Sequence, residues 1–135
     1  MNIRRRSREE ALKILYKMDI IDNWDISVMT EELSVREIRD LEKIDDYLEF
    51  LVNSIVTNKS FIDQKLITKL KNWKLGRLGV IERNILRVGV SEFYFSKDVP
   101  NKVVINEAIE LAKKYSTKDS AGFINGILDS IYKEK

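Results

Sequence analysis

The sequence predicts an all-α protein of six to seven short helices that form a single domain over residues 1–135. Apolar residues recur at helical spacing along almost the whole chain, and no segment alternates apolar and polar side chains as a strand does. The chain has only 5 glycines and 1 proline, too few for the many turns of a β-sandwich. Its 135 residues are the size of one domain, and we find no linker.

The first predicted helix spans about residues 7–22. Ser7 and Glu10 fit a capping box at its start, and apolar residues follow at i, i+3, i+4 and i+7 spacing. In the turn that follows, Asp25 or Ser27 can cap a second, short segment.

Three further helices are predicted in the middle of the chain. Apolar stripes indicate one helix over about residues 44–58 and another over about residues 60–73. Gly76 and Gly79 bracket the start of the next helix, whose apolar residues run over 78–93.

Two helices complete the predicted fold. Pro100 is well placed near the first position of one, because proline fixes the backbone angle that a helix start needs. Its apolar face covers residues 104–115. Ser116 or Thr117 can then cap the last helix, whose stripe covers residues 124–131.

The composition favours a binding protein over an enzyme. The chain has no Cys and no His, so thiolate nucleophiles, imidazole bases and the commonest zinc ligands are missing. Adjacent carboxylates such as Asp45 and Asp46 would point apart on a helix, so we expect no catalytic, metal or cofactor site. No apolar run approaches the roughly 18 residues of a membrane span, and no secretory signal is recognisable. We therefore expect a soluble, cytoplasmic protein.

Charge is segregated along the chain. Residues 1–18 contain six basic and two acidic residues, and residues 19–50 contain three basic and eleven acidic residues. Residues 51–135 contain fifteen basic and nine acidic residues. This pattern indicates one face suited to a polyanion and another that repels it. The alternative is chance clustering on solvated helix surfaces.

The N-terminal arginines are the first candidate for function. Arg4, Arg5, Arg6 and Arg8 crowd a helix start, where cations are mildly unfavourable for the helix itself. Arginine grips phosphate bidentately and stacks on bases, so residues 1–7 are typical of an arm that binds nucleic acid. The sequence leaves open whether this arm is flexible, and a solvated terminus or a membrane-surface anchor are the alternatives.

The second candidate is an arc on the central helix, opposite its apolar stripe. An arc with two cations, an amide and an aromatic side chain can hold phosphates and stack a base. An ordinary solvated helix face is the alternative, and spacing alone favours it. The arc consists of Arg83, Asn84, Arg87, Ser91 and Tyr94.

The third candidate is the start of the last helix. Phe123 lies at the edge of the apolar stripe near Asp119, and Gly122 and Gly126 lack side chains one turn apart. Glycine inside a helix costs about 0.5–1 kcal/mol relative to alanine, so the pair suggests close approach of a helix or ligand. Core packing is the default expectation, and an exposed stacking aromatic is the alternative.

Four stretches occur in this order along the chain: "RRRSREEALKILY", "IERNILRVGVSEF", "DVPNKVVINEAIELAKKY" and "DSAGFINGILD". Together they resemble the NusB family of bacterial transcription antitermination factors. The resemblance covers essentially the whole chain and is least distinctive over residues 23–45. It implies two small, roughly orthogonal helical bundles and no enzymatic activity.

The resemblance also implies partners. The family binds the boxA element of nascent single-stranded RNA jointly with the small-subunit ribosomal protein NusE. That pair joins a complex on RNA polymerase that resists termination, notably during ribosomal RNA synthesis. Both a monomer and a homodimer stay open.

Site residues follow from the matching motif positions. The arginines would hold phosphates, the aromatic side chains would stack on bases, and the aspartate would accept a hydrogen bond from a base edge. Glu82 is the expected residue on the NusE-facing side, because a carboxylate suits a basic ribosomal protein. The expected RNA-binding residues are Arg5, Arg6, Arg8, Tyr16, Arg87, Asp119 and Phe123.

Three departures from the family pattern are visible. Gly122 stands where relatives often carry a basic residue, and Ser116 replaces a glycine cap. Trp73 and the aromatic run over residues 93–95 could support an apolar contact, including a homodimer.

Two alternatives to antitermination remain. One is a helical interaction adaptor, and the other is the NusB-like domain of ribosomal RNA methyltransferases, which would need a methyltransferase domain beyond residue 135.

Overall fold

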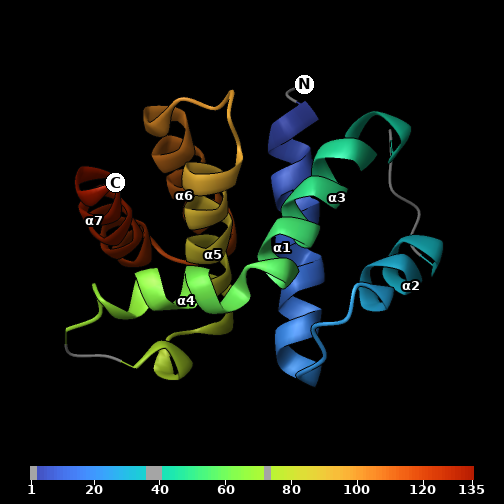
Figure 1. Ribbon diagram of the computed structural model, residues 1–135, viewed down its shortest axis with the longest axis horizontal. Helices are drawn as coiled ribbons and strands as arrows, with labels where there is room; N and C mark the ends of the chain where they lie inside the picture. The colour runs from blue at the N-terminus through green and yellow to red at the C-terminus, as the bar shows by residue number, and fades with distance from the viewer. Residues whose placement is uncertain (1–2, 36–40, 72–73) are drawn as a thin grey trace.

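Seven α-helices and one short 3-10 helix make up most of the described chain (Figure 1). The computed structural model describes residues 3–35, 41–71 and 74–135, and only the backbone of residues 41–45. The elements are α1 (Ile3–Ile21), α2 (Ser27–Val35), α3 (Leu41–Thr57), α4 (Lys59–Ile67), η1 (Leu75–Arg77), α5 (Val80–Phe95), α6 (Asn101–Tyr115) and α7 (Lys118–Glu134). These three segments contain no strand, which confirms the predicted all-α class.

The helices form two groups that are joined through α5. In one group α1 packs against α2 and α3, and in the other α5, α6 and α7 pack together. α5 also contacts α1, α3 and α4, and α4 runs across α5 in Figure 1. These contacts agree with the expected division of the helices into two small groups.

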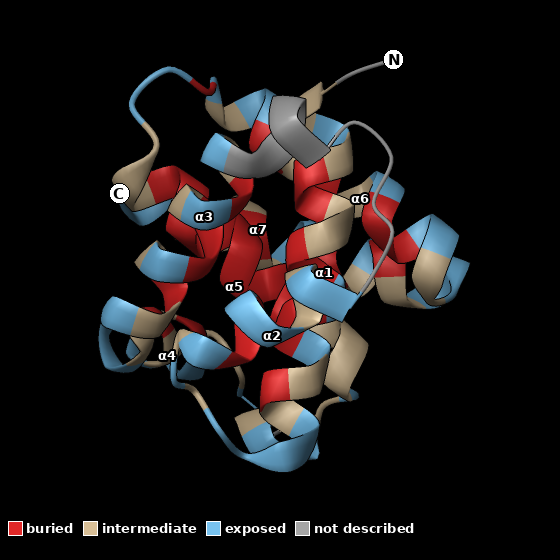
Figure 2. Ribbon diagram, turned by 90° about the vertical axis from the view of Figure 1, so that its right-hand side faces the viewer, coloured by how far each residue is buried: buried red, intermediate tan, exposed pale blue. Residues whose placement is uncertain are grey.

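The middle of α5 is buried on every side, which its sequence pattern did not predict. Figure 2 shows this helix at the centre of the molecule, covered by the others. Asn84 and Ser91 have no exposed surface, and Arg87 is 4% exposed. The expected solvent-facing arc is therefore wrong in this stretch, because Asn84 binds Asp19 on α1 and Arg87 binds Asp19 and Asp63 on α1 and α4.

The first helix begins earlier than predicted. α1 starts at Ile3, so the residues expected to form an arm are helical from this position. The predicted capping box is wrong, because Ser7 is buried within the helix and its hydroxyl donates to the Ile3 carbonyl at 2.9 Å. Asp98, between α5 and α6, binds Arg4, and Glu107 of α6 binds Arg5, which offsets the unfavourable charge at the helix start.

Other helix ends follow local capping chemistry. The Thr117 side chain accepts a hydrogen bond from the backbone N–H three residues later, as predicted for the start of α7. The Asp25 side chain accepts a hydrogen bond from the first backbone N–H of α2. Of the two candidate caps, Asp25 and Ser27, Asp25 is therefore the one that caps this helix. α4 ends at Ile67, earlier than the predicted residue 73, and Trp73 lies outside the described residues.

Close helix packing occurs at Gly89, not at the glycine pair of α7. A Cβ atom on Gly89 would lie 2.9 Å from both terminal methyl groups of Leu128, so α7 approaches α5 closely here. Nothing lies within 4 Å of the corresponding positions on Gly122 and Gly126, which are exposed. The default expectation of core packing for that pair is wrong, because α7 buries the adjacent face through residues 124–131.

Apolar side chains from all seven helices form one core. Each buried Leu, Ile, Val, Phe or Met contributes about 1.5–3 kcal/mol relative to an exposed one. The aromatic run over residues 93–95 belongs to this packing. The rings of Tyr94 and Phe95 lie edge-on to Phe61, with centroids 5.1 and 5.9 Å away. Within the described residues, no helix combines the length and apolar character that a bilayer crossing needs.

Candidate nucleic-acid interface

Three hollows are lined by residues of α1, η1, α5, α6 and α7 and their connecting segments, and we call their combined surface the hollowed face. The arginine hollow, of about 190 Å³, is lined by Arg5, Arg8, Glu9, Glu107, Glu110, Leu111 and Lys114. The tyrosine hollow, of about 270 Å³, is lined by Leu12, Lys13, Tyr16, Ile81 and Tyr115. The phenylalanine hollow, of about 340 Å³, is lined by Arg77, Leu78, Gly79, Glu82, Asp119, Ser120 and Phe123.

Direct contacts connect the three hollows. The Tyr115 hydroxyl, in the tyrosine hollow, donates to Glu9 of the arginine hollow at 3.3 Å. Ser116, the next residue, donates to Glu82 of the phenylalanine hollow. The serine that replaces a glycine cap thus joins the end of α6 to the start of α5.

In the arginine hollow each outer cation has an acidic partner. Arg5 donates to both carboxylate oxygens of Glu107, at 2.9 and 2.7 Å. Lys114 donates to Glu9. The hydrogen bonds from Arg5 lower the pKa of Glu107 despite its burial, so this carboxylate is ionised at neutral pH.

Arg8 lies at the buried side of the arginine hollow and is 2% exposed. Its Nε is 2.9 Å from Glu92 Oε1, and its Nη1 is 3.3 Å from Glu107 Oε1. Tyr47 also donates to Glu92, and burial, with the Glu92 carboxylate next, raises the pKa of Tyr47 to about 12. The expected phosphate contact of Arg8 does not fit this placement, because interior carboxylates hold its guanidinium.

The tyrosine hollow offers an aromatic surface. Tyr16 is 42% exposed and belongs to α1, whereas Ile81 and Tyr115 come from α5 and α6. An exposed aromatic ring beside apolar side chains and Lys13 can stack a base and attract a phosphate. Tyr16 is thus an exposed ring beside a cation, and its expected stacking on a base stays a prediction.

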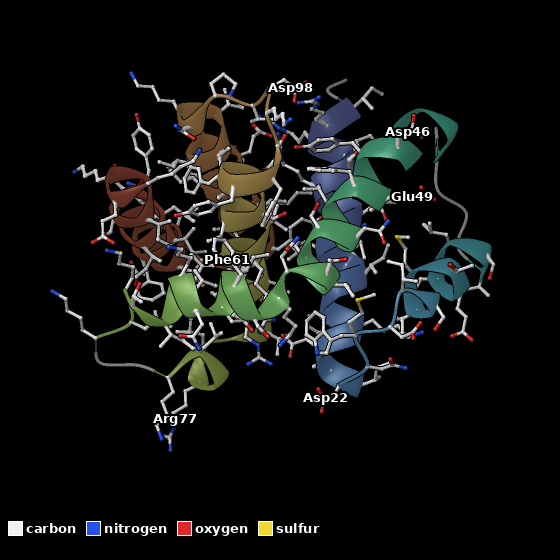
Figure 3. The ribbon with its side chains drawn as sticks, viewed as in Figure 1. Asp22, Asp46, Glu49, Phe61, Arg77 and Asp98 are labelled. Atoms are coloured by element: carbon white, nitrogen blue, oxygen red, sulfur yellow. The ribbon has the colours of Figure 1, made fainter. Side chains whose placement is uncertain are left out.

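The phenylalanine hollow brings together three of the expected residues. Asp119 is exposed, Phe123 is half-buried, and Glu82 lies beside them rather than on a separate surface. Arg77 completes this hollow and projects away from the ribbon in Figure 3. The sequence-based site did not include Arg77, although the residue lies in a stretch rich in lysine and arginine.

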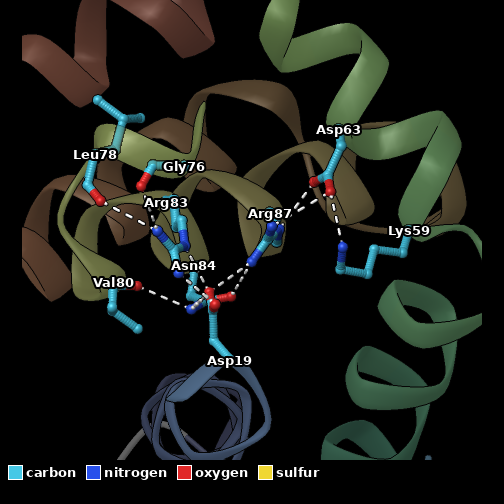
Figure 4. Close-up of polar contacts among 9 residues, drawn as sticks. All are labelled: Asp19, Lys59, Asp63, Gly76, Leu78, Val80, Arg83, Asn84 and Arg87. Carbon is cyan, nitrogen blue, oxygen red and sulfur yellow. Dashed lines mark hydrogen bonds and ion pairs between the residues drawn. The ribbon is translucent and has the colours of Figure 1, made fainter. Parts of the chain in front are cut away.

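Arg87 belongs to a buried polar network, not to the hollowed face (Figure 4). Its Nε donates to Asp63 Oδ1 at 2.8 Å, and its Nη1 donates to Asp19 Oδ2 and Asn84 Oδ1, both at 2.9 Å. Burial opposes ionisation of Asp19, but hydrogen bonds from Arg83 and Asn84 outweigh it and lower the pKa of Asp19. The expected phosphate contact of Arg87 is therefore corrected to a structural role.

The remaining expected residue, Arg6, is half-buried on α1 and lines none of the three hollows. The hollowed face thus gathers Arg5, Tyr16, Asp119 and Phe123, with Glu82 among them. In the part of the chain that the structure describes, no three acidic side chains group together as metal ligands would. The chemistry of this face is that of cations, carboxylates and aromatic rings.

Comparison with known proteins identifies the family. The NusB family profile matches residues 5–133. The transcription antitermination protein NusB of Clostridium novyi is 43% identical over 131 residues, which cover 96% of this chain and 98% of the relative. A structure of NusB from T. maritima has a TM-score of 0.85 and 40% identity, and covers 97% of this chain and 91% of its own. A crystal structure of the antitermination factors NusB and NusE with double-stranded RNA has a TM-score of 0.84 and 30% identity. The match covers 100% of this chain and 99% of the chain in that structure. This chain belongs to the NusB family.

Proposed function

We propose that this protein is a transcription antitermination factor that binds boxA-type single-stranded RNA together with NusE. The pair would act on RNA polymerase, especially during ribosomal RNA transcription. The row of hollows carries this proposal, because it aligns the Arg5 cation, the Tyr16 ring and the Phe123–Asp119 pair on one face. Cations that follow a backbone beside rings that stack bases are the usual means of binding single-stranded nucleic acid.

The residues have different roles in this proposal. Arg5, Arg6 and Arg77 attract phosphates, and Tyr16 and Phe123 stack on bases. Asp119, which is exposed, accepts a hydrogen bond from a base edge. The protein would have no catalytic role and would act in the cytoplasm.

The position of Glu82 bears on cooperation between the two partners. We propose that Glu82 faces NusE, a basic partner, and its carboxylate lies in the same hollow as Phe123. RNA and NusE would then meet at this hollow. Each would add binding surface for the other, so their binding should be cooperative.

The direct test is a fluorescence-anisotropy titration of three labelled RNAs: a boxA-like single strand, a scrambled strand and a boxA duplex. Each is titrated with and without NusE at two salt concentrations. The duplex is included because a structurally similar NusB was crystallised with double-stranded RNA. Preference for the single-stranded boxA, sharpened by NusE, would support the proposal. Equal, weak and salt-sensitive binding that NusE does not change would favour a helical adaptor with a basic face.

Two kinds of contact can be separated by variants. Arg5→Ala/Arg6→Ala should weaken binding of all RNAs and make it less dependent on salt, because phosphate contacts release counterions. Phe123→Ala should weaken binding with little change in salt dependence. Tyr132→Ala is the control, since Tyr132 is a 40% exposed aromatic on the same helix and lines none of the three hollows.

A further inference from the structure

We propose that Glu107 limits RNA affinity by competing with RNA phosphate for Arg5. The inference rests on the proposed function only in taking a nucleic-acid phosphate as the anion that reaches the arginine hollow. Its starting point is that a cation expected to bind RNA is already bound by an acid of the same chain.

The Arg5–Glu107 pair has the geometry of an arginine–phosphate contact. Nε and Nη2 of Arg5 point at the two carboxylate oxygens, at 2.9 and 2.7 Å. Arginine uses the same two-pronged arrangement for phosphate. A phosphate cannot occupy these two donors while Glu107 holds them.

The two partners are anchored very differently. The Glu107 side chain is 9% exposed, whereas that of Arg5 is 51% exposed. Glu107 also binds Arg8 at 3.3 Å, and Arg8 is fixed by Glu92 at 2.9 Å. Arg5 can therefore turn outward to a phosphate while Glu107 keeps a cationic partner in the interior.

The surrounding negative charges require Arg5 to turn from Glu107 towards the phosphate before RNA can bind. Glu9 and Glu110 also line the arginine hollow, and Glu9 binds the other exposed cation there, Lys114. A phosphate that entered the hollow would approach three carboxylates. It can bind favourably only if Arg5 leaves Glu107 and moves towards the RNA.

A neighbouring ion pair provides a matched control. Arg4 donates to both oxygens of Asp98, at 3.2 and 2.7 Å, and this pair lies close to the start of α1 (Figure 3). Its side chains are 38% and 70% exposed, and Arg4 lines none of the three hollows. Asp98→Asn removes one negative charge from the same region without releasing Arg5.

The test compares RNA affinity in five proteins: wild type, Glu107→Gln, Arg5→Ala, the Glu107→Gln/Arg5→Ala double variant and the control Asp98→Asn. Glutamine keeps an oxygen that accepts from Arg5 and Arg8 but removes the charge that competes with phosphate. We expect Glu107→Gln to bind both boxA-like and scrambled strands about three- to fivefold more tightly, in the upper part of the range for surface ion pairs because only Arg5 of this pair is exposed. The gain should vanish in the Arg5→Ala background, and Asp98→Asn should change affinity by less than about twofold.

Each outcome decides the question. A Glu107→Gln protein that binds both strands like wild type, or a gain that survives Arg5→Ala, would overturn the inference. A gain on both strands with no preference for boxA would uphold it while refuting the proposed function.

If Glu107→Gln does not fold, nitrogen-15 NMR of the Arg5 Nε–H in wild type decides. Its signal should change when scrambled RNA is added, and an unchanged signal at saturation would contradict competition.

Discussion

Replacement of Arg87 by alanine tests whether this residue supports the fold or contacts RNA. Its side chain is 5% exposed and bridges α1 and α4, with Asp19 at 2.9 Å and Asp63 at 2.8 Å. The guanidinium also lies over the Trp24 ring, 5.0 Å from its centroid. Because these contacts join both helix groups through α5, we expect Arg87→Ala to lower the free energy of unfolding.

The structure indicates how large the loss should be. Removing one partner of a buried ion pair costs about 3–5 kcal/mol, since it leaves a charge without compensation. Here Asp19 keeps Arg83 and Asn84, and Asp63 keeps Lys59 at 3.1 Å, so neither carboxylate is left alone. We therefore expect a loss near the lower end, about 3 kcal/mol. For a chain of 135 residues this corresponds to a fall of about 10 °C in Tm.

Urea unfolding followed by circular dichroism measures the loss, and an unchanged m-value would show that the transition remains comparable. Arg77→Ala is the matched control, because Arg77 is exposed and lines the phenylalanine hollow. It should change stability by less than about 0.5 kcal/mol and weaken RNA binding. The reverse pattern, an Arg87→Ala protein as stable as wild type that no longer binds RNA, would refute the structural assignment.

Three further predictions concern the interior. Gly89→Ala should be less stable than Gly126→Ala by about 1–3 kcal/mol in urea unfolding, because its Cβ would crowd Leu128 at 2.9 Å while position 126 is open. Ser91→Ala should leave stability unchanged or raise it by up to about 1 kcal/mol in the same assay, because the Ser91 hydroxyl is buried without a hydrogen-bond partner in the described structure. Burial opposes ionisation of Asp19, yet its hydrogen bonds lower its pKa. The ionised Asp19 therefore contributes to the free energy of unfolding above the unfolded pKa of about 3.9, and this contribution is lost as pH falls through the lower folded pKa. We expect Tm to drop below about pH 4, and to drop less steeply in Asp19→Asn.

Local signals in the sequence predicted most of the helices. Capping depends on residues within one turn, so the sequence could narrow the cap of α7 to Ser116 or Thr117, and the structure shows that Thr117 is the cap. Ser7 shows the limit of this reasoning, because its neighbours fit a capping box although α1 begins at Ile3 and the Ser7 hydroxyl donates to the Ile3 carbonyl. The same holds for Gly89, whose close approach to Leu128 depends on a helix 39 positions later in the printed sequence.

The charged residues explain why the candidate site was harder to predict than the fold. In sequence, Arg5, Arg8 and Arg87 are equivalent cations, and their surroundings depend on acids elsewhere in the chain. Arg8 binds Glu92, 84 positions away, and Arg5 binds Glu107, 102 positions away. Because acids of the same chain neutralise these cations, the local charge of a segment overstates the positive surface that a polyanion meets. The salt dependence of RNA binding should therefore correspond to fewer phosphate contacts than the number of arginines in the motifs suggests.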